Sequence, residues 1–233
     1  MMNIRVIYMY AAIGGGMDKA MNFVAIDFET ATSGEHSICS MGICVVMNNK
    51  VTETKEILIK PVPFEFNERN IMIHHITPEM VINCQTFDAY WKEIFPYLND
   101  RIVVAHNASF DVGALINTLT HFNLEFPNFK YICTVKLSQK AYPELPSHKL
   151  NNLADALGID FSHHQAGDDA YACAMVLIKI LEDFNLDSLE EIEKKFDLGV
   201  GYIYPGCHIP CTKNKKIKPK NLQTTVFDAM TRC

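Results

Sequence analysis

FVAIDFET, residues 23–30, is the segment from which we derive the architecture of the whole chain. Four apolar residues in a row are typical of a strand buried inside a sheet. Side chains alternate between the two faces of a strand, so Asp27 and Glu29 share one face and Phe28 takes the other. Two carboxylates about 7 Å apart, two residues of strand rise, repel each other unless a cation lies between them. The segment therefore indicates either a site for Mg²⁺ or Mn²⁺, which prefer carboxylate oxygens, or a strand end whose acids face water.

The composition favours one globular domain with a substantial core, because 48% of the 233 residues are hydrophobic and 21% are charged. No apolar run approaches the roughly 20 residues that a membrane-spanning helix needs. The formal net charge is −6, which argues against an extended surface that wraps duplex nucleic acid. A local nucleic-acid site is still compatible with this charge, because bound metal ions reverse it locally. The eight scattered cysteines, without a clear secretory signal, predict reduced thiols and a cytoplasmic location.

The two ends of the chain differ in character from its middle. Residues 1–21 begin with an apolar stretch and include three consecutive glycines. We expect this leader to lie outside the fold, with the true start at Met17 or Met21; a weak signal peptide is the alternative. Residues 199–233 combine Gly, Pro and a run of lysines without a sustained period, which predicts a C-terminal tail. One domain is therefore expected over residues 22–198.

The middle of the chain predicts strands first and then strands that alternate with helices. Strands over 37–47 and 51–60, joined by a tight turn at Asn48 and Asn49, would extend the first strand into an antiparallel meander. The further expected elements are a helix over 87–98 begun by Thr86, a strand over 101–105, a helix from Ser109 as N-cap, a strand near 130–133, and helices over 134–141, 147–159, 163–181 and 187–196. This order predicts an α/β fold with a mixed five-stranded sheet, antiparallel and then parallel, flanked by helices.

More carboxylates follow at a strand end and a helix start. Asp111 comes shortly after the strand over 101–105, and Asp168 and Asp169 begin the most apolar helix. An aspartate at a helix N-terminus is favoured by the helix dipole, so capping alone explains each of them. The alternative is that these acids converge with those of the first strand on one cleft.

Such a convergence would have a definite chemistry. Four carboxylates in one cleft would hold two hard cations about 3.5–4 Å apart, an arrangement that stabilises the attacking and leaving oxygens of a phosphoryl displacement. His164 precedes Asp169 by five residues. Because histidine titrates near neutral pH, it can take the proton of an attacking water and release it afterwards.

The order of DFET (27–30), HNASFD (106–111) and H-x4-D (164–169) resembles the DEDD exonuclease superfamily in its histidine subtype. The resemblance runs from about residue 22 to 185 and implies a ribonuclease H-like fold. IHHIT (73–77) and SHKLNNLADALGI (147–159) resemble the polymerase-associated members, such as the proofreading epsilon subunit of bacterial DNA polymerase III. By position, the resemblance implies metal-binding acids and a general base, which are Asp27, Glu29, Asp111, Asp169 and His164, with the adjacent His163 and Asp168 set aside.

The resemblance also implies a set of residues that contact the 3′-terminal nucleotide. These are Phe28, Thr30, Ala31, His106, Asn107 and Phe110. For Phe28 and Phe110, packing in the core is the alternative. His74, His75 and His106 can equally be hydrogen-bonded structural histidines.

The implied activity is that of a metal-dependent 3′–5′ exonuclease that uses two Mg²⁺ or Mn²⁺ ions and releases nucleoside monophosphates from single-stranded DNA. The implied role is proofreading or repair beside a DNA polymerase. An exoribonuclease of the oligoribonuclease or RNase T kind is the alternative, because the sugar is distinguished by contacts to the 2′-hydroxyl. A module that binds nucleic acid without catalysis is a further alternative.

Two features of the expected tail suggest binding partners. QTTVF, residues 223–227, resembles the short motif that docks in the pocket of a sliding clamp, through Gln223, Val226 and Phe227. Tethering of this kind raises the effective concentration of a weakly binding enzyme. Cys207, His208, Cys211 and Cys233 are potential zinc ligands, although their spacing lacks a paired CxxC.

Overall fold

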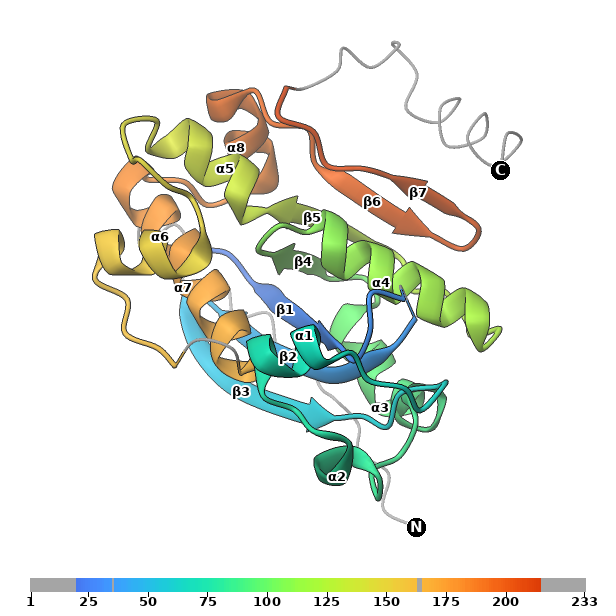
Figure 1. The fold of residues 1–233 in the computed structure, drawn as a ribbon. Coiled ribbons are helices and arrows are strands. Elements are labelled where there is room, and N and C mark those ends of the chain that lie inside the picture. The colour runs from blue at the N-terminus through green and yellow to red at the C-terminus, as the bar shows by residue number, and fades with distance from the viewer. Residues whose placement is uncertain (1–19, 35, 163–164, 215–233) are drawn as a thin grey trace.

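The computed structural model describes residues 20–34, 36–162 and 165–214. These residues form a mixed α/β fold around one seven-stranded sheet (Figure 1). The strands are β1 (Phe23–Thr30), β2 (Ile38–Met47), β3 (Lys50–Leu58), β4 (Ile102–Ala105), β5 (Phe129–Cys133), β6 (Gly201–Tyr204) and β7 (Cys207–Ile209). The helices are α1 (Glu68–His74), α2 (Pro78–Val81), α3 (Phe87–Leu98), α4 (Ser109–His121), α5 (Thr134–Ala141), α6 (Leu150–Leu157), α7 (Ala166–Phe184) and α8 (Leu189–Phe196).

Several predictions concern residues outside this described part, and they stay predictions. They are the leader up to residue 19, the histidines His163 and His164, the clamp motif with Gln223, Val226 and Phe227, and Cys233. Met21, which was assigned to the leader, packs in the core with 3% of its surface exposed. No helix of the described residues is long and apolar enough to cross a membrane.

The expected antiparallel meander is confirmed. β1 pairs antiparallel with β2, and β2 pairs antiparallel with β3. The turn between β2 and β3 places Asn48 and Asn49 at φ values of 53° and 58°, the left-handed conformation that a two-residue hairpin requires and that asparagine tolerates. β4 then pairs parallel with β1, and β5 pairs parallel with β4. The mixed α/β class is therefore confirmed.

The sheet has seven strands where five were expected, because residues 201–209 form a hairpin rather than part of a tail. β6 pairs antiparallel with β5, and β7 with β6. A Cβ at Gly201 would stand 2.2 Å from the ring of Tyr131, so the ring lies directly against the glycine backbone. The Tyr131 hydroxyl lies 2.7 Å from His208 Nε2 and accepts the backbone N–H of Cys211 at 3.1 Å. These contacts between distant segments order a stretch whose own sequence pattern shows no period.

The zinc alternative for this region finds no support. Within the described residues, Cys207, His208 and Cys211 do not bring three ligand atoms close enough together for one metal ion. His208 instead contacts Tyr131 through Nε2.

Most helix boundaries lie within three residues of the expected ones. α6 and α7 begin at Leu150 and Ala166, three residues later than expected. Ser109 is the first residue of α4, and Ala108 takes the N-cap position that was expected for Ser109. Gly158 ends α6 in the left-handed conformation, at φ 67°, as a C-terminal glycine commonly does.

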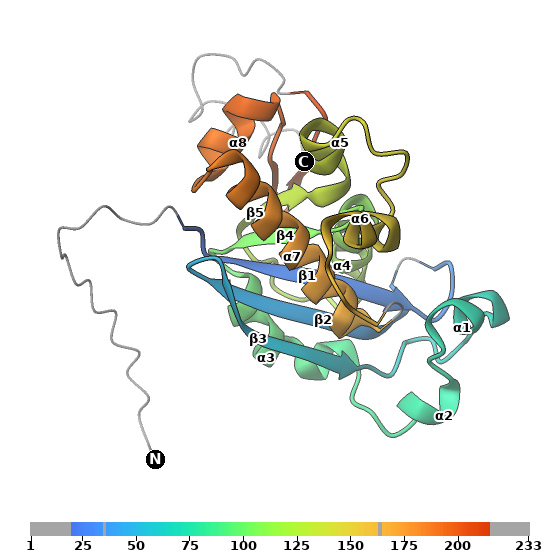
Figure 2. The same ribbon diagram turned by 90° about the vertical axis from the view of Figure 1, so that its left-hand side faces the viewer.

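The long helix α7 lies close against the sheet. It crosses β1, β2 and β3 in Figure 2, with α3 behind these strands, and it packs on β2 and β1. A Cβ at Gly42 of β2 would stand 1.7 Å from the carbonyl oxygen of Ala166. A residue larger than glycine at position 42 would therefore push the first turn of α7 away from the sheet. That first turn carries Asp168 and Asp169.

We expect Gly42→Ala to lower the free energy of unfolding by about 3 kcal/mol, the upper end for overpacking in a rigid core. The melting temperature should fall by about 10 °C, which differential scanning calorimetry would measure. Gly113→Ala is the matched control, because a Cβ at that helical position meets nothing within 4 Å. The control should be neutral or slightly stabilising. Equal melting temperatures for the two variants would contradict the close approach of α7 to Gly42.

Candidate active site

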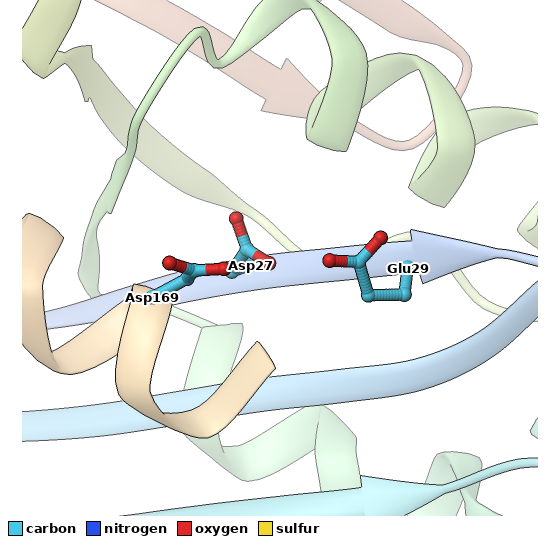
Figure 3. A group of neighbouring side chains, drawn as sticks. All are labelled: Asp27, Glu29 and Asp169. Carbon is cyan, nitrogen blue, oxygen red and sulfur yellow. The ribbon is translucent and has the colours of Figure 1, made fainter. Parts of the chain in front are cut away.

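Three carboxylates meet at the end of β1. β4 pairs with β1 only over Val24–Ile26, so the last residues of β1 extend beyond the end of β4. Asp27 and Glu29 lie on this extension and share one face of the strand, and Asp169 approaches the same face from the first turn of α7 (Figure 3). Oxygen atoms of these three side chains lie within 4.8 Å of one another. The expected convergence of acids on one cleft is thus present for these three residues.

Asp111 joins the group from α4. Its Oδ1 accepts the backbone N–H of Phe28 at 3.0 Å, a donor between the two acids of β1 that lies beyond the pairing with β4. Asp111 is only 1% exposed, and within the described residues its Oδ2 is buried without a hydrogen-bond partner. A buried carboxylate oxygen without a partner is costly, so this atom indicates that a ligand completes the site.

Burial and the charges of neighbouring acids raise the pKa values of Asp27, Glu29 and Asp111. Burial, followed by the charges of Asp111 and Asp169, raises the pKa of Asp27 well above its usual range. Burial and then Asp169 raise the pKa of Glu29 to about 8. Burial raises the pKa of Asp111 to about 7, against the lowering effect of the Phe28 N–H. Full ionisation of the group at neutral pH therefore requires a compensating positive charge.

These residues fit divalent cations. All four donors are carboxylates, which are the ligands that hard cations such as Mg²⁺ and Mn²⁺ select. Asp111 lines the same pocket, and its unpartnered Oδ2 is a further candidate ligand atom. Asp27, Glu29, Asp111 and Asp169 are accordingly the residues that would hold the metal.

Because of these pKa values, the metal-free protein should lose stability as the pH rises. Glu29 titrates near 4.5 normally and at about 8 in the folded protein. Between these values the folded state binds more protons than the unfolded chain, so the free energy of unfolding falls with rising pH and the loss is complete above pH 8. Between pH 5 and 8 we expect the melting temperature in EDTA to fall by about 5 °C or more.

Thermal melts in EDTA and in saturating Mn²⁺ would measure this effect. Mn²⁺ should raise the melting temperature more at pH 8 than at pH 5, because binding to the ionised acids stabilises the folded state. Glu29→Gln should reduce the slope in EDTA, since it removes one of the titrating groups. A metal-free melting temperature that stays constant or rises between pH 5 and 8 would contradict the mutual repulsion of the acids.

The acids open into a pocket of about 640 Å³. Four of the residues expected to contact the terminal nucleotide line this pocket: Phe28, His106, Asn107 and Phe110. The Phe110 side chain is exposed by 47%, whereas Phe28 is only 1% exposed. The packing alternative therefore describes the Phe28 ring, and the exposed ring of Phe110 is available to a ligand.

Thr30 and Ala31 do not line the pocket. The carbonyl oxygen of Thr30 accepts from Asn70 Nδ2 at 2.8 Å and lies 3.2 Å from Nε2 of the buried His74. The Nδ1 atom of His74 accepts the backbone N–H of Ile76 at 3.0 Å. His74 is thus a hydrogen-bonded structural histidine that ties α1 to the end of β1.

Part of the pocket wall was not predicted. Seven residues without an expected role line it: Ile73 from α1, Val135 and Gln139 from α5, and His148, Lys149, Leu150 and Asn151 around the start of α6. Ile73 and the residues at the start of α6 lie in the segments IHHIT and SHKLNNLADALGI, which suggested a family resemblance but no contact. Val135 and Gln139 lie outside both segments. Only the fold brings these segments opposite the acids.

The chain is similar to known proteins in both sequence and fold. The family model RNase_T, described as an exonuclease, matches residues 24–177. DNA polymerase III PolC-type of Thermotoga maritima is 32% identical over 216 residues, covering 89% of this chain and 15% of the relative. The 3′-5′ exonuclease DinG of Bacillus subtilis is 30% identical over 167 residues, covering 69% of this chain and 18% of the relative. The chain thus spans less than a fifth of the length of either relative.

Solved structures show the same fold. Exonuclease X, in complex with 5′ overhanging duplex DNA, superposes with a TM-score of 0.62 at 24% identity, covering 74% of this chain and 98% of that one. The nuclease domain of 3′hExo, a DEDDh family member bound to rAMP, superposes with a TM-score of 0.60 at 20% identity, covering 70% and 93%. Together with the family match over residues 24–177, these likenesses show that the chain belongs to the RNase_T exonuclease family.

Proposed function

We propose that this protein removes nucleoside 5′-monophosphates one at a time from the 3′ ends of single-stranded DNA, in proofreading or repair beside a DNA polymerase. The observation that carries the proposal is the convergence of Asp27, Glu29 and Asp169 within 4.8 Å, in a pocket with Asp111 and an exposed aromatic ring. The preference for DNA is supported by the name of one relative, a DNA polymerase III of the PolC type.

In this proposal each residue has one task. The four carboxylates would hold two Mg²⁺ or Mn²⁺ ions, which would supply positive charge to neutralise the phosphate and to lower the pKa of a water molecule. His164, which lies outside the described residues, takes the proton of the attacking water. The water oxygen bonds to phosphorus as the P–O3′ bond breaks, so the shortened strand leaves with a 3′-hydroxyl. Phe110 lies against the terminal base, with His106 and Asn107 beside it.

An exoribonuclease is the second candidate, and one observation favours it. The fold also matches a 3′-exonuclease whose structure is described as 3′-end specific recognition of histone mRNA stem-loop, with a TM-score of 0.60 at 19% identity. The 2′-hydroxyl is the group by which a protein distinguishes the two substrates.

The partners and location form part of the same proposal. Gln223, Val226 and Phe227 would tether the enzyme to a sliding clamp, which raises the effective concentration of the 3′ end. A cytoplasmic location agrees with the cysteines of the described residues, which are free thiols.

The test is degradation of a 5′-labelled single-stranded DNA oligomer and its RNA twin, in Mg²⁺, in Mn²⁺ and in EDTA. We expect a metal-dependent ladder that shortens from the 3′ end and proceeds faster on DNA. Faster degradation of RNA would favour the second candidate. No degradation of either strand by the folded, metal-supplied protein would contradict the exonuclease proposal.

A further inference from the structure

Helix α5 holds two histidines of the pocket wall in the same way. Thr134 and Ser138 lie one helical turn apart and are both fully buried. Thr134 Oγ1 lies 2.9 Å from Nδ1 of His106, and Ser138 Oγ lies 3.0 Å from Nδ1 of His148. Both histidines line the pocket that contains the four acids.

The hydroxyl group of Ser138 determines which ring nitrogen of His148 carries the proton. Ser138 Oγ donates its only hydrogen to the carbonyl oxygen of Val135 at 3.1 Å. It therefore accepts from His148, whose Nδ1 must be the protonated ring nitrogen. The Nε2 atom of His148 is then the nitrogen that remains for a ligand, and a proton there would make it a donor to an anion. The ring is fixed by a buried anchor rather than left to rotate in solvent.

The wall around His148 has the opposite charge character to the acid group. Lys149 follows it directly, is exposed, and lines the same pocket. Gln139, one residue after the anchor Ser138, also lines the pocket. A side-chain amide can present its NH₂ group to an anion. The pocket is thus acidic along β1, α4 and α7, and carries donors to anions where α5 and α6 meet.

A nucleic-acid strand bound in this pocket would use both its acidic side and the side that carries donors to anions. The acids would act at the scissile phosphate, whereas the remainder of the strand carries further phosphates that a protein of net charge −6 repels overall. Local donors must offset this repulsion, and lysine and histidine beside the scissile position would do so. We propose that His148 and Lys149 bind the phosphodiester one nucleotide upstream of the scissile bond, and that Ser138 positions His148. This proposal rests on the proposed function.

Two substrates separate this role from the chemistry. A single-stranded DNA oligomer carries the upstream phosphate, whereas thymidine 5′-(4-nitrophenyl phosphate) has only the phosphate that is hydrolysed. His148→Ala and Lys149→Ala should each raise KM for the oligomer by about tenfold more than KM for the small ester, with kcat for the oligomer little changed. Lys149→Ala should also reduce the slope of log(1/KM) against log salt by about 0.7, one single-strand phosphate contact.

Two further variants complete the experiment. Ser138→Ala should reproduce the selective KM increase in weaker form, because it removes the anchor of His148. Lys92→Ala, an exposed lysine of α3 that does not line the pocket, should leave both substrates unaffected. Because Lys149 is exposed, Lys149→Ala carries the test even where His148→Ala reduces folding.

The outcomes are distinct. An equal increase in KM for the oligomer and for the ester would show that His148 and Lys149 support the structure of the protein or the hydrolysis itself. This result would overturn the proposal. Unchanged kinetics on both substrates would overturn it as well. A wild-type protein that hydrolyses neither substrate would instead contradict the proposed function itself.

Discussion

Asp27→Asn is expected to lower kcat by about 10³-fold or more, while raising the melting temperature of the metal-free protein. Asp27 stands within ligand distance of Glu29 and Asp169, and its pKa is raised by burial and by the charges of Asp111 and Asp169. Loss of one ligand removes several kcal/mol of charge stabilisation from a metal-assisted displacement. The same change removes a repelling charge, which stabilises the folded protein when no cation is present.

The opposite signs of these two effects make the prediction specific. Single-turnover degradation of a labelled oligomer would measure the rate, and thermal melts in EDTA would measure stability. Asp168→Asn is the matched control, because it removes the same charge from the same helical turn outside the group of close acids. The control should keep kcat within about threefold and should not raise the melting temperature. If Asp27→Asn kept the wild-type kcat, the assignment of Asp27 as a metal ligand would be wrong.

The sequence was sufficient wherever neighbouring residues determine structure. Strand alternation placed Asp27 and Glu29 on one face, and a one-residue slip would have separated them from Asp169. The hairpin between β2 and β3 followed from two asparagines, because few residues adopt its left-handed turn. The apolar run of the most buried helix predicted α7, although its start lay three residues later.

The remaining features depend on contacts between distant segments. Residues 201–209 appeared to be a tail because Gly and Pro interrupt their pattern, yet Tyr131 of β5 packs against Gly201 and orders them. The helix α1 is only seven residues long, too short for a reliable periodic signal. The role of Gly42 could not be read from the sequence either, since it depends on how closely Ala166 approaches.

The candidate site divides in the same way. Its acids were identified because carboxylates at strand ends and helix starts form a chemical pattern in the sequence itself. The part of its wall formed by His148, Lys149 and Gln139 was not identified, because these residues come to the pocket only when α5 and α6 fold beside α7. The hydrogen bond from the Phe28 N–H to Asp111 likewise joins residues 83 positions apart. The repulsion among the acids therefore depends on the tertiary structure that brings them together, whereas the local sequence shows only that the acids are present.

His164→Ala is expected to lower kcat by about 10²- to 10⁴-fold, the range for loss of a general base. The prediction rests on the sequence position of His164 five residues before Asp169, since His164 lies outside the described residues. Unlike Asp27, His164 is not expected to hold the metal, so the variant should bind Mn²⁺ with unchanged affinity. Thermal melts of His164→Ala and Asp27→Asn in Mn²⁺ would therefore distinguish the loss of a general base from the loss of a metal ligand.

The pH dependence of kcat distinguishes a base from a structural histidine. In the wild type, kcat should rise with pH and then level off, as the histidine side chain loses its proton and becomes able to accept another. In His164→Ala the levelling off of kcat at high pH should be absent, because the residual rate should keep rising with hydroxide concentration. His163→Ala is the matched control, because it removes the same side chain one residue earlier, and it should keep both the rate and the profile. A wild-type profile in His164→Ala, or a lost profile in His163→Ala, would assign the proton transfer to another group.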